Sequence, residues 1–257
     1  MNLSKRMEAV AAMVSTGNVL ADVGTDHGYI PIALVQRGRI PSAIAMDLRE
    51  GPLEHAKEHI ISAGLQDCIM TRLSDGVAAL SQGEAESIVI AGMGGELVIH
   101  ILRDGEAVCK AAKELILQPQ SELAKVRRFL RENGYHIADE DMVLEDGKFY
   151  PMMRVEPSLN SGEAHDGTFC TGMTQDVMTR GAESAITEET ALCDIYGPLL
   201  LLGKHPVLLL FLEKEQRQQE EILAQLMAQP VSDKLSGRIR EVKEKLAYNK
   251  KAQEMMR

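Results

Sequence analysis

The sequence predicts an α/β fold, in which a doubly wound and mostly parallel sheet is followed by a C-terminal α-helical hairpin. Three observations predict it. Short apolar runs alternate with amphipathic stretches through the first two-thirds of the 257 residues, which is typical of βαβ units with helices on both faces of a sheet. Two later strand-like runs are joined by Asp146-Gly147, a hairpin signal that predicts an antiparallel end to the sheet. Two long helical patterns close the chain.

Seven runs have the length and apolar content of strands. The first five cover residues 18–22, 43–47, 68–73, 87–91 and 114–118, and the last two cover 135–144 and 148–156. Amphipathic stretches at 31–37, 52–63, 96–103 and 122–133 predict helices that connect successive strands among the first six. Ending such a sheet in an antiparallel pair is typical of class I methyltransferases rather than of dehydrogenases. Ligands bind at the carboxyl ends of the parallel strands, so the turns there are the candidate site.

The C-terminal part predicts two helices, at residues 206–228 and 232–257, joined at 229–231. Apolar residues of the second recur at alternating spacings of four and three, as in the seam of a coiled coil, and two polar residues continue the series. These residues are Leu235, Ile239, Val242, Leu246, Asn249 and Gln253. Residues 157–186 are rich in Gly, Ser, Thr and acids, which indicates a linker or mobile loop. We therefore expect a cofactor-binding domain over 1–156 and a helical hairpin domain over 187–257.

The net charge of -10 is unevenly distributed. Thirteen acids against Lys148, Arg154 and Arg180 lie between residues 139 and 194, so the rest of the chain is neutral overall. The helix at 122–133 and the tail from residue 234 are locally basic, either as ordinary charged faces or as phosphate-binding surfaces. No signal peptide or membrane span is apparent. Four distant cysteines without a Cys-x-x-Cys pair predict neither a disulfide framework nor a cysteine zinc site, and they fit a reducing cytoplasm.

An acidic, glycine-punctuated turn follows the first strand. Residues 22–28 read Asp-Val-Gly-Thr-Asp-His-Gly, and glycines let the main chain approach a ligand closely, although such a turn also serves plain strand-to-helix packing. Thr25 and Asp26 interrupt the Gly-x-Gly-x-x-Gly spacing of a nicotinamide site. Asp26 is placed to meet the amino group of the methionine portion of S-adenosylmethionine, or alternatively to cap the next helix.

Comparable turns follow the next three strands. Asp47 lies 23 residues after Gly24, the interval at which nucleotide-binding folds place an acid against ribose hydroxyls. Asp75 follows the third strand, and we expect its carboxylate to accept a hydrogen bond from the exocyclic amine of the cofactor's adenine. Residues 91–95, Ala-Gly-Met-Gly-Gly, are expected to leave room for a bulky methyl acceptor. Each turn alone has an ordinary structural reading, but four in register predict a donor site. The candidate cofactor-binding residues are Asp22, Gly24, Thr25, Asp26, His27, Gly28, Asp47, Leu48, Asp75, Gly76, Ala91 and Gly92.

Seven short motifs are spread over nearly the whole chain. They are DVGTDHGYIP at 22–31, AMD at 45–47, SDG at 74–76, IAGMGG at 90–95, LQPQ at 117–120, EDGKFY at 145–150 and YGP at 196–198. Together they resemble the bacterial TrmK family of tRNA (adenine(22)-N1)-methyltransferases. The resemblance implies a Rossmann-like class I methyltransferase domain, S-adenosyl-L-methionine as donor, tRNA as acceptor, and a C-terminal hairpin that helps to hold the tRNA.

Methylation of adenine at N1 uses an in-plane lone pair, so direct in-line transfer requires positioning rather than a general base. The candidate catalytic residues are Asp26, Gly92, Met93 and Gly94. A base that leaves its stack calls for a flat partner, and Tyr29 is the best placed aromatic, with core packing as the alternative. The candidate tRNA-binding residues are Lys5, Arg6, Tyr29, Arg127, Arg128 and Arg131.

We expect a monomer or weak dimer. A catalytically silent tRNA-binding protein and a methyltransferase of small molecules are the alternative functions. Intact cofactor motifs disfavour the first, and the basic helical hairpin disfavours the second.

Overall fold

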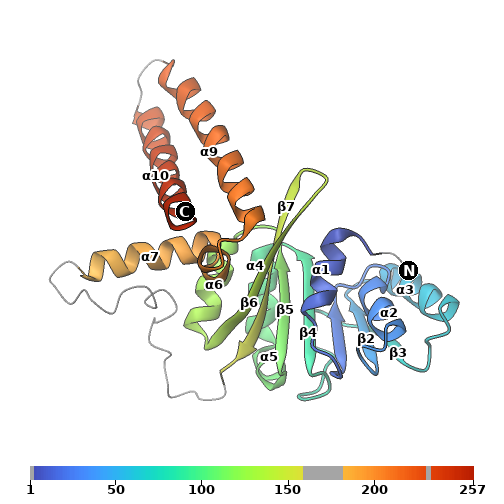
Figure 1. Ribbon diagram of the computed structural model, residues 1–257. Helices are drawn as coiled ribbons and strands as arrows, with labels where there is room; N and C mark the ends of the chain where they lie inside the picture. The colour runs from blue at the N-terminus through green and yellow to red at the C-terminus, as the bar shows by residue number, and fades with distance from the viewer. Residues whose placement is uncertain (1–2, 159–181, 230–232) are drawn as a thin grey trace. The chain divides into compact units, whose positions relative to one another are not determined.

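The computed structural model describes residues 3–158, 182–229 and 233–257 (Figure 1). The chain divides into two compact units, Met1–Asp166 and Gly167–Arg257. The boundary between them falls in the segment for which the sequence predicts a linker, and residues 159–181 of that segment lie outside the described residues. The proposed division into three segments therefore stays a prediction.

The first unit is built around one seven-stranded sheet. Its strands lie in the order β3-β2-β1-β4-β5-β7-β6; the first five are parallel, and β7 runs antiparallel to both β5 and β6. Their bounds are β1 Leu20–Val23, β2 Ala43–Asp47, β3 Ile69–Leu73, β4 Ser87–Met93, β5 Glu114–Pro119, β6 Tyr135–Glu145 and β7 Lys148–Pro157. The predicted fold class is confirmed, including the antiparallel end.

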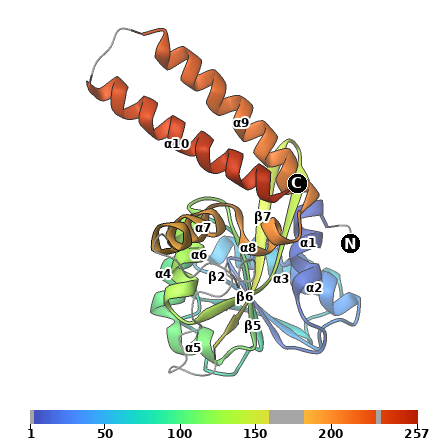
Figure 2. The same ribbon diagram turned by 60° about the vertical axis from the view of Figure 1, so that its left-hand side comes forward.

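Six helices cover the two faces of this sheet (Figure 2). They are α1 Lys5–Met13, α2 Tyr29–Gln36, α3 Glu50–Ser62, α4 Gly95–Asp104, α5 Glu106–Ala111 and α6 Leu123–Glu132. One apolar cluster joins the sheet to α1, α2 and α3, and a second joins it to α4, α5 and α6. Every residue of β1, β2 and β5 is buried, as expected for strands covered on both faces.

Helices α1 and α5 are additions to the sequence prediction. The Ser4 side chain caps α1 by accepting a hydrogen bond from the Met7 backbone N–H at 3.3 Å. Helix α5 has only six residues, too few to show a helical period in the sequence.

The second unit is helical. Its described helices are α7 Ala182–Tyr196, α8 Pro198–Leu202, α9 Pro206–Met227 and α10 Asp233–Met255, and α9 and α10 pair side by side in Figures 1 and 2. Helices α7 and α8 are a further addition to the prediction, and α7 begins inside the segment expected to be a linker. Within the described helices of the chain, we find none that combines the length and apolar character needed to cross a membrane.

The predicted seam between α9 and α10 is confirmed. Val242 and Leu246 are buried, and Asn249 is wholly buried. The Asn249 side-chain amide donates to the Leu212 carbonyl oxygen at 3.0 Å and to Glu215 Oε2 at 2.8 Å. The polar residue in the seam thus satisfies its donors across the helix pair, which fixes the register of the two helices.

Candidate functional site

The turns after β1, β2, β3 and β4 contact one another in the order of the strands. The backbone N–H groups of Gly24 and Thr25 both donate to the Met46 carbonyl oxygen at 2.8 Å, and the Ser74 N–H donates to the Asp47 carbonyl oxygen at 2.9 Å. Met93 of the fourth turn lies directly over Gly24. The sheet therefore brings the four sequence motifs to one edge, where open α/β sheets bind their ligands.

Gly24 makes the approach of the first and fourth turns possible. It has a φ of +77°, and a Cβ at this position would lie 2.1 Å from Met93 Cε. Gly28, at the start of α2, also adopts the left-handed conformation, with a φ of +68°. Both glycines of the motif are required by the backbone itself, which explains their spacing without any appeal to a ligand.

Asp22 is a buried carboxylate at the start of this turn, 6% exposed. Burial raises the pKa of Asp22 to about 6, and the negative charge of Asp47 contributes to the rise. The Thr25 hydroxyl approaches the carboxylate and partly offsets the rise in pKa without completing a hydrogen bond of ordinary geometry. Such a group is costly to keep ionised, and perturbed carboxylates of this kind gather at functional sites.

Two buried polar atoms of the first turn lack a partner in the described part of the chain. They are Thr25 Oγ1 and His27 Nδ1. Buried polar atoms are normally hydrogen-bonded, so both are suited to a polar ligand held by this turn. Asp26 is exposed, with its Oδ2 3.3 Å from His27 Nε2. These features fit a cofactor such as S-adenosylmethionine, which offers both polar groups and positive charge.

Asp47 ends β2 and is 9% exposed. Its Oδ1 accepts the backbone N–H of Arg49 at 2.8 Å, which turns the carboxylate back over the start of α3. Leu48 lies beside it with 62% of its surface exposed, an apolar side chain at the edge of the predicted donor site. The pair presents a carboxylate and an apolar surface next to each other, the combination needed by a ribose and its base.

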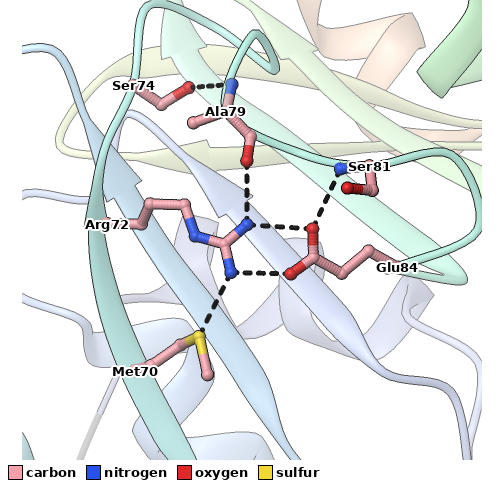
Figure 3. A network of polar contacts seen from close by, with 6 residues as sticks. All are labelled: Met70, Arg72, Ser74, Ala79, Ser81 and Glu84. Carbon is pink, nitrogen blue, oxygen red and sulfur yellow. Dashed lines mark hydrogen bonds and ion pairs between the residues drawn. The ribbon is translucent and has the colours of Figure 1, made fainter.

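A polar network that sequence reasoning missed holds the turn that contains Asp75 and Gly76 (Figure 3). Arg72 donates twice to Glu84, at 2.9 and 2.6 Å, and once to the Ala79 carbonyl oxygen at 2.9 Å. The Arg72 guanidinium lowers the pKa of Glu84 to about 2. Ser74 Oγ donates to the Gly76 carbonyl oxygen at 2.9 Å and accepts from the Ala79 N–H at 3.1 Å. Asp75 is exposed on a turn that these bonds fix in place.

The glycines of the fourth turn have different roles. Gly92 has a φ of +79° and lies where the pairing of β4 with β5 shifts register. Gly95 is buried, and a Cβ there would lie 2.4 Å from the Ser121 carbonyl oxygen. Gly94 is exposed. Gly92 and Gly94 are thus the exposed glycines of this turn, whereas Gly95 is required by packing against the chain that follows β5.

Four rings stack beside the first turn. The Tyr29 ring centroid lies 5.0 Å from that of His27 and 5.3 Å from that of His59, and His55 lies 5.5 Å from His27. His59 Nδ1 is also 3.0 Å from the His27 carbonyl oxygen. Tyr29 is therefore half-buried in a ring cluster rather than packed in the core. Sequence reasoning missed His55 and His59, although their four-residue spacing places them on one side of α3.

The basic residues predicted to bind tRNA lie in different environments. Arg127 is a correction to the prediction: it is 2% exposed and its Nε donates to Glu140 Oε1 at 2.9 Å, so it is not available to a phosphate. Arg128 and Arg131 are exposed on α6. The ammonium group of Lys5 donates to the Leu144 carbonyl oxygen at 3.1 Å.

Arg6, another of the predicted tRNA-binding residues, borders the fourth turn, with its Nη1 3.5 Å from where a Gly92 Cβ would lie.

The fold and the edge formed by these four turns define a methyltransferase-domain protein. A family model described as a methyltransferase domain matches residues 3–153. The tRNA (adenine(22)-N(1))-methyltransferase of Bacillus subtilis is 38% identical over 167 residues, 65% of this chain and 70% of that protein. The crystal structure of the B. subtilis m1A22 tRNA methyltransferase TrmK, 29% identical, aligns with a TM-score of 0.80 over 98% of both chains.

Streptococcus pneumoniae Sp1610 in complex with S-adenosyl-L-methionine is similar as well. It is 32% identical and aligns with a TM-score of 0.77, over 98% of this chain and 99% of that one. The chain belongs to the TrmK family of tRNA (adenine(22)-N1)-methyltransferases.

Proposed function

We propose that this chain transfers the methyl group of S-adenosyl-L-methionine to N1 of adenine 22 in tRNA, in the cytoplasm. The observation that carries the proposal is the unbroken series of contacts from the Asp75 turn through Asp47 and Gly24 to Met93, in a chain of this family. The series brings the residues proposed to hold the nucleoside and those proposed to border the reacting methyl group to one edge of the sheet.

The donor is held by residues of the first three turns in this proposal. Thr25 Oγ1 and His27 Nδ1 supply partners for its polar groups, and Asp22 and Asp26 supply negative charge for its amino group. Asp47 accepts the ribose hydroxyl protons, and Leu48 covers the base. Asp75 and Gly76, in the turn fixed by the Arg72–Glu84 pair, accept hydrogen bonds from the exocyclic amine of the donor's adenine. When bound, S-adenosylmethionine supplies an electrophilic methyl group.

The chain's own contribution to the reaction is positioning. Adenine N1 has a free lone pair, so the protein has no proton to remove before attack. Gly92 and Gly94 are exposed and have no side chains, so the target adenine is admitted beside them. Met93 lies between this adenine and Gly24. Tyr29 offers a ring on which an extruded base stacks. Asp26, exposed at the end of the first turn, stabilises positive charge as it passes from sulfur to the base.

In this proposal, exposed basic side chains of both units hold the tRNA. Arg128 and Arg131 on α6 and the lysines and arginines of α10 supply phosphate contacts. The second unit thereby serves as a tRNA-binding domain, joined through the segment predicted as a linker, and the chain acts as a monomer or weak dimer.

The decisive experiment incubates the full chain with methyl-labelled donor and an unmodified tRNA transcript, and then maps the product nucleoside. We expect 1-methyladenosine at position 22, and none in a matched transcript that carries guanine there. Tight tRNA binding without methylation would identify a silent binding protein. Donor turnover on small molecules with no tRNA product would identify the other alternative, and either result would contradict the proposal.

A further inference from the structure

Gln118 is a wholly buried polar residue that connects the fourth turn to helix α1. It lies near the end of β5 with no exposed surface. Its Oε1 accepts two hydrogen bonds, from the Gly92 backbone N–H at 3.2 Å and from Arg6 Nη1 at 3.0 Å. Its own Nε2 donates to the Pro119 carbonyl oxygen at 3.3 Å, which orients the amide so that the oxygen faces both donors.

The bond to Gly92 has a specific structural cause. The pairing of β4 with β5 matches Ala91 to Gln118 and then Met93 to Pro119, so Gly92 is an extra residue in the ladder. The backbone N–H of such a bulge has no partner on the neighbouring strand. The Gln118 side chain takes the place of that partner, and thereby sets the conformation of the residue at which the adenine is admitted.

The bond to Arg6 places a positive charge at the same position. The guanidinium carbon lies 5.5 Å from the centroid of the Tyr150 ring, which supports one face of the group. No carboxylate of the described residues forms an ion pair with this guanidinium. With Nη1 held by Gln118, the planar guanidinium still has further N–H groups that can donate to a phosphate in a bidentate contact.

We propose that Gln118 is a positioning residue, which holds the Arg6 guanidinium against the Gly92 bulge so that Arg6 binds the phosphate of the nucleotide to be methylated. The proposal rests on the proposed function, since it identifies the group that fixes the target nucleotide at the reacting edge. A neutral side chain is needed here, because its oxygen orients the guanidinium without neutralising its charge. Phosphate binding and the shape of the acceptor turn are thereby coupled through one amide oxygen.

The test measures the tRNA dissociation constant of the full chain as a function of salt, together with kcat and donor affinity. Arg6→Gln should reduce the slope of log affinity against log salt by about one, the value for one lost phosphate contact. Gln118→Leu should reduce the slope by a similar amount and lower kcat more than about tenfold, with donor affinity within about twofold of the original. Arg37→Gln, which removes a charge paired with Glu8 on another surface, is the matched control and should leave the slope unchanged.

Rescue separates positioning from simple support of the fold. Gln118→Glu keeps an acceptor for both donors, and should recover most of the lost kcat while its added charge weakens tRNA binding through Arg6. If Gln118→Leu retains the original salt slope, or if it loses donor binding and thermal stability along with activity, the positioning role is wrong. Because the slope is a binding measurement, it tests Gln118 even if the original chain makes no 1-methyladenosine, the result that would instead contradict the proposed function.

Discussion

Replacing Asp22 by asparagine should stabilise the unliganded protein at neutral pH. The Asp22 carboxyl is buried, and its pKa is raised from 3.8 to about 6. Well below pH 3.8 the group is neutral in the folded and unfolded chains alike, so it has no effect on their balance. As the pH rises from about 4 to 6, the unfolded chain releases the proton first, so the free energy of unfolding falls and stays lower above pH 6.

The magnitude follows from the difference between the two pKa values. At about 1.4 kcal/mol for each factor of ten in proton affinity, ionised Asp22 costs about 3 kcal/mol at pH 7.5. Asparagine avoids the charge but loses part of the contact with Thr25, so we expect a net gain of ~2 kcal/mol. In a protein of this size that gain corresponds to a rise in Tm of about 4–8 °C.

The assay is thermal or urea unfolding of both proteins without donor, at pH values from 4.5 to 8. The gain from Asp22→Asn should grow with pH up to about 6 and then remain constant. Asp67→Asn, at an exposed position in the loop before β3, is the control and should change little at any pH. A gain that is the same at every pH, or a loss at pH 7.5, would refute the assignment of the cost to ionisation of the buried carboxyl.

Three further predictions concern the donor site, the fourth turn and the buried ion pair. Asp47→Ala should weaken donor binding at least about tenfold by titration calorimetry, while tRNA affinity by filter binding stays near its original value; equal losses would contradict the assigned role. Gly95→Ala should lower the free energy of unfolding by about 2 kcal/mol or more because its methyl group meets a backbone oxygen, whereas Gly51→Ala, with open space around it, should be neutral or slightly stabilising. Arg127→Met should lower the free energy of unfolding by about 3–5 kcal/mol because the buried Glu140 carboxylate loses its ion pair with Arg127, with unchanged tRNA affinity of the folded fraction; reduced affinity would show that Arg127 does contact the tRNA.

The sheet could be predicted from the sequence because its strands are short apolar runs that end at glycine or acidic turns. Buried parallel strands need near-continuous apolar residues, and β1, β2 and β5 show them. The parallel order then brings successive strand ends to one edge, which is why the turns at Gly24, Asp47, Asp75 and Gly92 could be grouped before their contacts were known. Their roles toward donor and tRNA stay predictions.

The side-chain partners could not be predicted in the same way. Arg127 and Arg128 are neighbours on one helix, and the sequence does not show that the first faces Glu140 of β6 while the second faces outward. The role of Gln118 depends on a bulge in the adjacent strand, which is a property of the pairing rather than of either segment. Such contacts join residues far apart in the chain, and hydrophobic periodicity carries no information about them.

The position of Asp22 beside Asp47 also explains why a costly carboxylate is compatible with the proposed donor. Their mutual repulsion contributes to the raised pKa of Asp22, and a cation bound there would reverse it. S-adenosylmethionine carries positive charge on its sulfur and amino group, so its binding should lower the pKa of Asp22 and release a proton near pH 6. The increase in Tm caused by saturating donor should therefore be larger at pH 7.5 than at pH 5, although the unliganded protein is less stable at pH 7.5.

S-adenosylhomocysteine keeps the amino group but lacks the sulfonium charge, so an equal pH dependence with this product would identify the amino group as the partner of Asp22. A donor effect independent of pH would show that Asp22 does not sense the ligand.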